Sequence, residues 1–191
     1  MVRRYKRQTS GELRDFMEQR ARDKEQRWRQ DACAPSPKPY TLCSKMTLIS
    51  ACLVGINCMY NGASDPRQHF IEQIVQGNML PICPEQLGGL PTPRSPSEIV
   101  GGTGEDVLDN KARIYTKYGV DVTQAFLRGA NETLYLARLV GAEMIILKQN
   151  SPSCGCGRIY DGTFTGTLRE GNGVTAALLL RENIRIEAIA R

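Results

Sequence analysis

Residues 47–55, TLISACLVG, form a nearly continuous apolar run that ends at a glycine. A short apolar run of this kind is typical of a strand that is buried on both faces of a parallel sheet. Similar runs follow at residues 79–85 (MLPICPE), 143–148 (EMIILK) and 185–190 (RIEAIA). We therefore expect these four segments to be strands of one sheet.

Segments with helical character separate these strands. Residues 64–78 combine an Asp-Pro start signal, apolar residues at helical spacing and a closing glycine, and residues 122–142 and 173–184 also have a helical pattern. Residues 86–120 are crowded with glycine and proline, which predicts loops. Strands alternating with helices predict an α/β fold, a single Rossmann-like domain with a mainly parallel sheet flanked by helices, plus an N-terminal extension.

The first 45 residues differ from the rest of the chain in charge. Residues 1–45 contain 12 Lys and Arg against 6 Asp and Glu, whereas residues 46–191 contain 13 against 14. We expect residues 1–45 to be a basic, Pro-containing extension, partly helical or disordered, and residues 46–191 to be the α/β domain. A nearly neutral domain attracts a phosphate backbone weakly, so we expect it to act on a small molecule. Nucleic-acid binding through the basic extension stays open.

The sequence lacks the apolar segments that direct a chain into or across a membrane. No apolar run approaches the roughly 18–20 residues of a membrane span, and the first residues lack the apolar stretch of a secretory signal. We therefore expect a cytoplasmic protein with no membrane partner; the sequence does not indicate its oligomeric state.

The chain contains seven cysteines, an odd number. In a reducing compartment, this content favours metal binding or catalysis over structural disulfides.

Three of these cysteines follow predicted strands. Ligands of parallel sheets bind in the crevice beyond the carboxyl ends of the strands, and Cys52, Cys83 and Cys154 lie at three such ends. Three converging thiolates can hold a metal ion or an iron–sulfur cluster and leave one position open for a substrate. Cys58 and Cys156 compete with them for a ligand role.

Other polar residues lie next to these cysteines. Glu85 follows Cys83 by two residues, and a carboxylate beside a metal site can serve as a general base or acid. Ser151 and Ser153 can donate hydrogen bonds to a ligand, although serines beside a proline are also typical of turns. His69, the sole histidine, falls on a predicted helix, which does not favour a Cys–His nucleophile pair.

Five blocks of the chain, in the same order, resemble the thiouracil desulfidase family, which was long described as a domain of unknown function. They cover most of residues 47–187 and leave residues 1–45 outside. The blocks are SACLVGINCMYNG (50–62), ICPEQLGGLPTPRSPSEI (82–99), VDVTQAFLRGA (120–130), ILKQNSPSCG (146–155) and IYDGTFTGTLREGNGVTAALL (159–179).

The resemblance implies a specific chemistry. It implies a 4Fe–4S cluster that is held by Cys52, Cys83 and Cys154 and has one iron not ligated by protein. It implies non-redox desulfuration of thiouracil-type nucleobases, or of their nucleosides or nucleotides, to uracil and sulfide. It also implies that the catalytic glutamate and serine of the family correspond to Glu85 and Ser151. Cys156 departs from the family pattern as a spare thiol.

Two other readings of the sequence stay open. A non-catalytic nucleotide- or anion-binding module would hold phosphate at GGTGED (101–106) or at the helix start in GNGVTAALL (171–179), although no Walker motif is present. A zinc or redox-thiol protein would use Cys154 and Cys156 as a pair.

Overall fold

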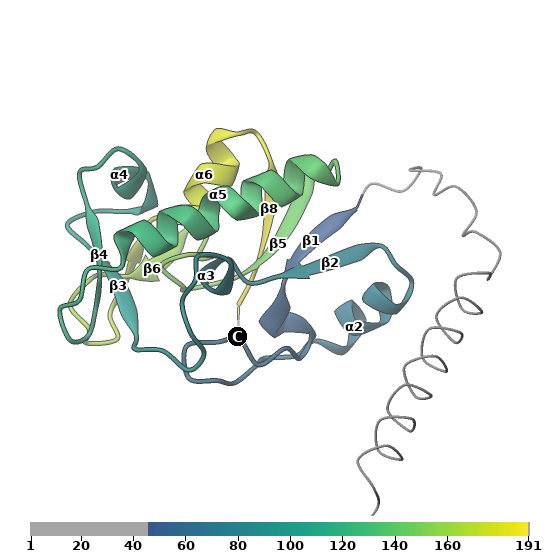
Figure 1. Ribbon diagram of the computed structural model, residues 1–191, viewed down its shortest axis with the longest axis horizontal. Coiled ribbons are helices and arrows are strands. Elements are labelled where there is room, and N and C mark those ends of the chain that lie inside the picture. The colour runs from purple at the N-terminus through teal and green to yellow at the C-terminus, as the bar shows by residue number, and fades with distance from the viewer. Residues whose placement is uncertain (1–45, 191) are drawn as a thin grey trace, which may run out of the picture. The chain divides into compact units, whose positions relative to one another are not determined.

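The computed structural model describes residues 46–190, so the predicted extension, with Cys33 and Cys43, lies outside the described residues (Figure 1). The predicted α/β fold is confirmed, because one four-stranded sheet is parallel throughout, in the order β2-β1-β5-β8. Each of the four predicted runs contains one of its strands, which are β1 (Thr47–Ser50), β2 (Met79–Ile82), β5 (Met144–Lys148) and β8 (Arg185–Ile189). The first two runs were predicted too long, because their second halves turn into short helices.

The centre of the sheet is fully apolar. Leu48 of β1 lies beside Leu80 of β2 and Ile145 of β5, and both Leu48 and Ile145 are fully buried. Neighbouring side chains along a strand point to opposite faces, so burial of both Leu48 and Ile49 requires cover on both faces of the sheet. The continuous apolar run in the sequence is therefore explained by a strand with no solvent-facing side.

Helices supply this cover. On one face, α5 (Thr123–Leu139) and α6 (Val174–Arg181) pack against each other and place Leu134 and Leu179 on the sheet. On the other face, α2 (Gln68–Val75) contributes Phe70 to a core with Ile49 and Ile146 (Figure 1). None of the helices within residues 46–190 has the length and apolar character needed to cross a membrane.

The segment predicted as loops contains regular structure, so that prediction was wrong in part. Residues 97–116 form an antiparallel pair around a short helix, with β3 (Ser97–Val100), α4 (Gly104–Leu108) and β4 (Arg113–Thr116). A second antiparallel pair, β6 (Arg158–Tyr160) and β7 (Leu168–Glu170), follows the third strand-end cysteine. Ile99, Ile114 and Ile159 join these pairs to α5 and α6 through a separate buried core.

The second strand ends at Ile82, and Pro84 occupies the first turn of a short helix, α3 (Pro84–Leu87), where its missing N–H costs nothing. The helix start predicted at the Asp-Pro pair is wrong in detail. Asp65 does not cap the first helix, since α2 begins three residues later with Arg67 at the N-cap position. The Asp65 carboxylate instead forms ion pairs with Lys148 and Arg67.

The order of the strands determines where the binding crevice lies. From β1 the chain moves to β2 on one side, and β5 then pairs with β1 on its other side. In open parallel sheets the crevice at such a reversal is where ligands bind, outside the carboxyl ends of the strands. Here it opens between the 3-10 helix η1 (Ala51–Val54), which follows β1, and the loop that follows β5.

A close helix contact fixes α3 beneath this crevice. A Cβ atom on Gly129 of α5 would lie 1.9 Å from the carbonyl oxygen of Pro84, and one on Gly88 would lie 2.1 Å from that of Ala125. Both obstacles are backbone atoms, which cannot rotate away. Only glycine at these positions allows α3 and α5 to approach this closely.

We predict that Gly129→Ala destabilises the protein by about 2–3 kcal/mol, as expected of an overpacked core. Alanine is otherwise the better helix former by roughly 1 kcal/mol, so a loss of stability isolates the steric clash. Thermal or urea unfolding measures the change. Gln124→Ala, at an exposed position of the same helix, is the matched control and should have little effect. Equal stability of Gly129→Ala and the wild type would contradict the tight contact.

Candidate functional site

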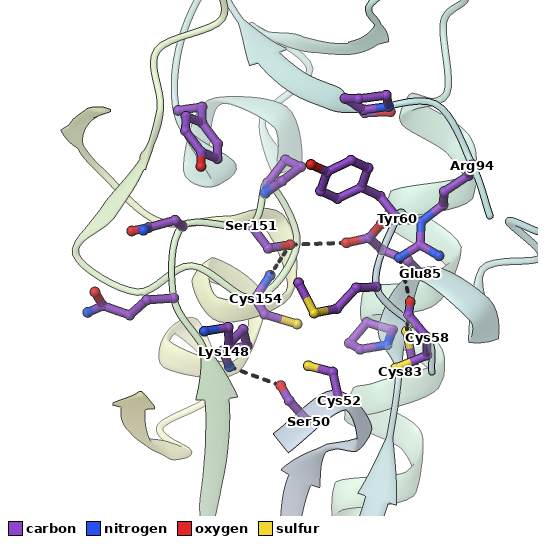
Figure 2. Close-up of a pocket in the computed structure, with 18 of the residues that line it drawn as sticks. Ser50, Cys52, Cys58, Tyr60, Cys83, Glu85, Arg94, Lys148, Ser151 and Cys154 are labelled. Atoms are coloured by element: carbon purple, nitrogen blue, oxygen red, sulfur yellow. Dashed lines mark hydrogen bonds and ion pairs between the residues drawn. The ribbon is translucent and has the colours of Figure 1, made fainter. Parts of the chain in front are cut away.

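One cavity of about 340 Å³ lies beyond the carboxyl ends of β1, β2 and β5, and the five predicted site residues all line it. Cys52 comes from η1, directly after β1, and Cys83 follows β2 as the N-cap residue of α3. Cys154 and Ser151 come from the loop after β5, and Glu85 lies in the first turn of α3 (Figure 2). The structure thus brings together residues that are up to 102 positions apart in the sequence.

The thiols in this cavity are shielded from solvent. Cys52 and Cys154 are each 7% exposed, Cys83 is half-buried, and Cys58, which also lines the cavity, is 2% exposed. All four are free thiols. Cys156 is a half-buried free thiol that does not line the cavity.

The environment favours the protonated form of three cavity thiols, those of Cys154, Cys83 and Cys58, because it raises the pKa of each. Burial, with the negative charges of Cys83 and Glu85 close by, raises the pKa of Cys154 well above its usual range. A hydrogen bond with Cys58, followed by burial, raises the pKa of Cys83 in the same direction. A hydrogen bond with Cys52 is the main cause that raises the pKa of Cys58 to about 11. Because metals bind thiolates, loading a metal here must displace protons, which a bound cation favours.

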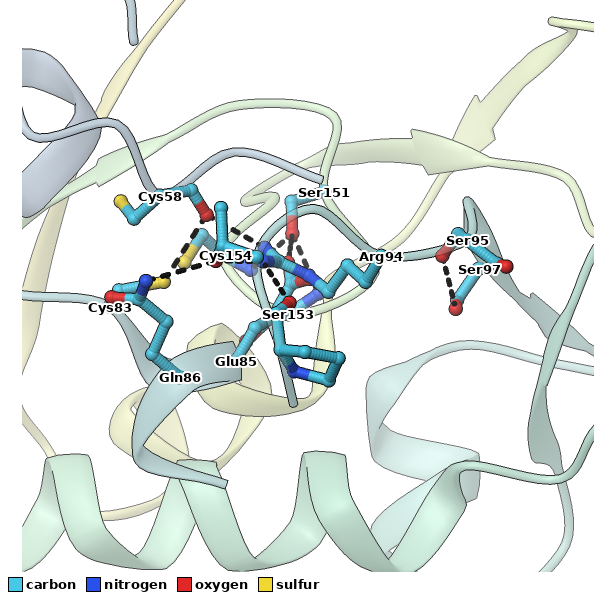
Figure 3. Close-up of polar contacts among 12 residues, drawn as sticks. Cys58, Cys83, Glu85, Gln86, Arg94, Ser95, Ser97, Ser151, Ser153 and Cys154 are labelled. Carbon is cyan, nitrogen blue, oxygen red and sulfur yellow. Dashed lines mark hydrogen bonds and ion pairs between the residues drawn. The ribbon is translucent and has the colours of Figure 1, made fainter. Parts of the chain in front are cut away.

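Glu85 is held on both of its oxygens. Ser151 Oγ donates a hydrogen bond to Glu85 Oε1 at 3.0 Å, and Arg94 Nε donates to Glu85 Oε2 at 2.6 Å. The side chains of Arg94 and Glu85 are only 7% and 14% exposed, so this ion pair is largely removed from water. A short charge-assisted bond of this kind fixes the orientation of the carboxylate (Figure 3).

The two serines of the SPSC loop have different surroundings. Ser151 Oγ accepts hydrogen bonds from the backbone N–H groups of Ser153 and Cys154, at 3.0 and 3.2 Å, while it donates to Glu85. Ser153 is buried away from the cavity, and its hydroxyl lies 2.8 Å from that of Thr175 on α6. Ser151 is therefore the serine that a ligand in the cavity can meet.

The start of α6 holds the same loop in place. The backbone N–H groups of Val174 and Thr175 donate to the carbonyl oxygens of Pro152 and Ser153, at 2.9 and 3.0 Å. These are the groups that a phosphate would need at this helix start. They are already satisfied by the loop, which argues against the predicted anion site at residues 171–179.

The other predicted anion site, residues 101–106, is also closed by its own contacts. Thr103 and Asp106 form a capping box at the start of α4, in which the Asp106 carboxylate accepts a hydrogen bond from the Thr103 N–H at 2.8 Å. The Gly104 N–H donates to the Asn172 carbonyl oxygen at 2.6 Å. A carboxylate already occupies the position that an anion would take.

A buried lysine lies at the floor of the crevice. Lys148, the last residue of β5, is 9% exposed, and its Nζ pairs with Asp65 Oδ2 at 2.5 Å. Its backbone N–H donates to Ser50 Oγ at 3.0 Å, which ties the ends of β5 and β1 together (Figure 2). A charged residue at the end of an apolar strand was the sequence signal for this pair, and sequence reasoning missed it.

A buried glutamate holds the opposite wall of the cavity. Glu98 of β3 is 7% exposed, and its Oε2 accepts hydrogen bonds from the backbone N–H groups of Gly162 and Phe164, at 2.9 and 3.0 Å. These amides belong to the turn between β6 and β7, and Gly166 of this turn lines the cavity together with Tyr160 at the end of β6. Glu98 and Arg94 were both missed by sequence reasoning, because nothing local distinguishes them from surface charges.

The sole histidine takes no part in the cavity. His69 is exposed on α2 and contacts Phe70, with ring centroids 3.9 Å apart. No histidine lies among the cavity residues of the part that the structure describes. The sequence argument against a Cys–His pair agrees with this placement.

The donor set of the cavity is sulfur-rich. Within residues 46–190, no three His, Cys, Asp or Glu side chains form a group that could hold a single metal ion. Four thiols instead surround a cavity that is much larger than one ion. Soft sulfur donors without histidine suit iron–sulfur clusters, and a cluster spreads its ligands farther apart than an ion does. The residues present therefore fit an iron–sulfur cluster.

Comparisons with known proteins agree with this chemistry. A family model described as 2-thiouracil desulfurase matches residues 47–189. The chain is similar to the uncharacterised protein YbbK of Bacillus subtilis (strain 168), with 49% identity over 141 residues, 74% of this chain and 93% of that protein. It is also similar to the solved structure of a 4Fe–4S-dependent thiouracil desulfidase, TudS, with 39% identity and a TM-score of 0.67, over 76% of this chain and 91% of that one.

Proposed function

The chain belongs to the 2-thiouracil desulfurase family, and from this premise we propose that it replaces the sulfur of a thionated pyrimidine with oxygen from water. The products are then uracil, or its nucleoside or nucleotide, and sulfide. The observation that carries this proposal is the convergence of three strand-end cysteines with the Glu85–Ser151 pair on one cavity. The overall change is hydrolytic, because the C=S bond is exchanged for C=O and no electron is gained or lost.

Cys52, Cys83 and Cys154 would hold the 4Fe–4S cluster. The three follow three neighbouring strands of the sheet, so the sheet brings the segments that carry them to one edge. When bound, the cluster would supply a soft iron without a protein ligand, which favours a thiocarbonyl sulfur over an oxygen and would polarise the C=S bond. The assignment is supported by the burial of the thiols and by the solved 4Fe–4S-dependent relative.

Glu85 would take a proton from the attacking water. Its carboxylate faces the cavity, and Arg94 holds one oxygen while the other accepts the Ser151 hydroxyl. A water molecule beside Glu85 can transfer its proton to the carboxylate as its oxygen attacks the ring carbon. The rigid pairing with Arg94 keeps this base at one angle, which favours a single productive geometry.

Ser151 would carry hydrogen bonds between the base and the ring. Two backbone N–H groups bind its oxygen, so the hydroxyl proton points to Glu85 in the free protein. Once Glu85 is protonated, the Ser151 hydroxyl can turn to donate to a ring nitrogen or oxygen. Serine thereby offers a route by which a proton reaches the ring as the C=S bond breaks.

The wall of the cavity is suited to a small planar ring. Tyr60, Gln149 and Asn150 line it and supply an aromatic face and amide groups that can pair with the polar edge of a pyrimidine. Residues 46–191 have nearly balanced charge, which supports a small substrate over a polynucleotide.

Sulfide release tests the proposed function. The protein is purified without oxygen, reconstituted with iron and sulfide, desalted, and incubated with 2-thiouracil, 4-thiouracil and their nucleosides and nucleotides. We expect sulfide and the corresponding uracil compound to appear in equal amounts from at least one of them. Cluster-loaded protein that releases no sulfide from any of these compounds would disprove the proposal. Cys156→Ala, which removes a thiol outside the cavity, should remain active.

A further inference from the structure

The turn between β6 and β7, residues 161–166, forms part of the cavity wall, but apolar packing does not hold it there. Gly166 of this turn lines the cavity, and so does Tyr160, which precedes the turn and is 36% exposed. Phe164, the large apolar residue of the turn, belongs to none of the three buried cores within residues 46–190. The position of this wall therefore depends on polar contacts.

The backbone of the turn adopts a conformation that few residues accept. Gly162, Phe164 and Gly166 have φ angles of 93°, 58° and 83°, all in the left-handed region. Glycine accepts this region readily, whereas a bulky residue such as Phe164 is unfavourable there. An unfavourable backbone conformation persists only where the surrounding contacts hold it.

The Glu98 carboxylate supplies such contacts. Its Oε2 accepts hydrogen bonds from the N–H groups of Gly162 and Phe164, at 2.9 and 3.0 Å, so one oxygen holds two of the three left-handed residues. Glu98 is 7% exposed, and no basic side chain within residues 46–190 forms an ion pair with it. A buried carboxylate without a cation depends on its hydrogen bonds, so Glu98 and the turn stabilise each other.

The turn also packs directly on the strand that carries Glu98. A Cβ atom on Gly162 would lie 2.5 Å from the carbonyl oxygen of Ile99 in β3. Pro96, Ser97 and Glu98 line the cavity next to this contact. The junction of β3 with the turn thus forms a section of the wall that contains no proposed cluster ligand and neither Glu85 nor Ser151. Changes at this junction can alter how well a ring binds without altering the groups that react.

We propose that Glu98 is a positioning residue for substrate binding, which fixes the turn at 161–166 so that Tyr160 and Gly166 form one wall of the pocket for the thionated pyrimidine. This inference rests on the proposed function. A wall that is ordered before the substrate arrives spares the substrate the cost of ordering it. Tyr160 offers the ring an aromatic face and a hydroxyl group.

Steady-state kinetics of the cluster-loaded protein tests this role. Wild type, Glu98→Ala and Glu98→Gln are reconstituted without oxygen and compared at equal iron content, on the compound that the wild type desulfurates best. Glu98→Ala removes the acceptor, so we expect KM to rise by about tenfold and kcat to stay within about twofold. Glu98→Gln retains an acceptor oxygen of the same reach, and its KM should lie closer to that of the wild type.

Two measurements without turnover check the same effect. The affinity for the uracil compound that the wild type produces, measured by calorimetry, should fall by the same factor in Glu98→Ala. Hydrogen exchange of residues 160–167, followed by mass spectrometry, should become faster, because two amides lose their acceptor. Glu170→Ala, which removes an exposed carboxylate from β7 of the same hairpin, is the matched control and should equal the wild type throughout.

Tyr160→Ala is a second variant that removes the side chain of the wall and leaves Glu98 in place. It should also raise KM and leave kcat nearly unchanged. Wild-type KM and product affinity in Glu98→Ala, or in Tyr160→Ala if Glu98→Ala does not fold, would overturn the inference and leave the proposed function intact. A lower kcat at unchanged KM in Glu98→Ala would also overturn it. A loaded wild type that releases no sulfide from any tested compound would remove the proposed function and this inference together.

Discussion

Cys154→Ala is expected to give a colourless protein with almost no iron and no sulfide release after anaerobic reconstitution. Cys154 is the proposed ligand from the loop after β5, and the other two ligands come from the opposite side of the crevice, after β1 and β2. Two thiolates leave two of the four irons without a protein ligand, so the cluster is no longer retained. Iron analysis and visible absorbance measure the loss, from about four irons per chain to nearly none.

Folding must be separated from metal loss in this variant. Cys154 is part of the core formed with Leu147 and Ala176, so removing its sulfur leaves a small void that lowers stability by about 1 kcal/mol. Circular dichroism should therefore show a folded protein at room temperature. Cys156→Ala, two residues away, should keep its iron. Full cluster content in Cys154→Ala would show that another thiol, such as Cys58 or Cys156, takes its place.

Glu85→Gln is expected to keep the cluster and lose most of its turnover. The amide is nearly the same size, and its one oxygen can still accept from Arg94, while its NH2 group replaces the oxygen that accepted from Ser151. The amide cannot take a proton from water. Removing a general base lowers the rate by roughly 10²- to 10⁴-fold. Sulfide release at saturating substrate, compared at equal iron content, measures the effect.

The matched control for Glu85→Gln is Glu132→Gln, which makes the same chemical change at an exposed position of α5. It should retain full activity. Wild-type turnover of Glu85→Gln with an intact cluster would contradict the role of Glu85 as the base. A Glu85→Gln protein that loses its iron would instead show that Glu85 supports the cluster, and its part in proton transfer would have to be tested by other means.

The proposed site could be assembled from the sequence to a considerable extent because its residues follow the strands. Each of Cys52, Cys83 and Cys154 comes within a few residues of an apolar run, and a parallel sheet places the ends of such runs at one edge. Glu85 and Ser151 are neighbours of these cysteines in the sequence, so the fold that brings the cysteines to the cavity also brings these two residues there. Their catalytic roles stay predictions.

The contacts of the residues that support the site could not be predicted from the sequence. Arg94 reaches Glu85 from a proline-rich segment that has no periodic pattern, and Lys148 pairs with Asp65 across 83 positions of the chain. Glu98 binds a turn more than 60 residues away. Side-chain pairing of this kind depends on how loops pack, and composition or spacing does not encode it locally.

The sequence by itself determined the parallel α/β sheet, because strands buried on both faces require uninterrupted apolar runs and covering helices show their apolar stripe. It also determined that a cysteine follows each of three of these strands. Only the tertiary structure decided that Ser151, and not Ser153, faces the cavity, and that Cys58 joins the other three thiols. The physical reason is that both choices depend on contacts between distant segments. The start of α6 turns the SPSC loop toward Glu85, and Arg94 holds the Cys58 backbone inside the site.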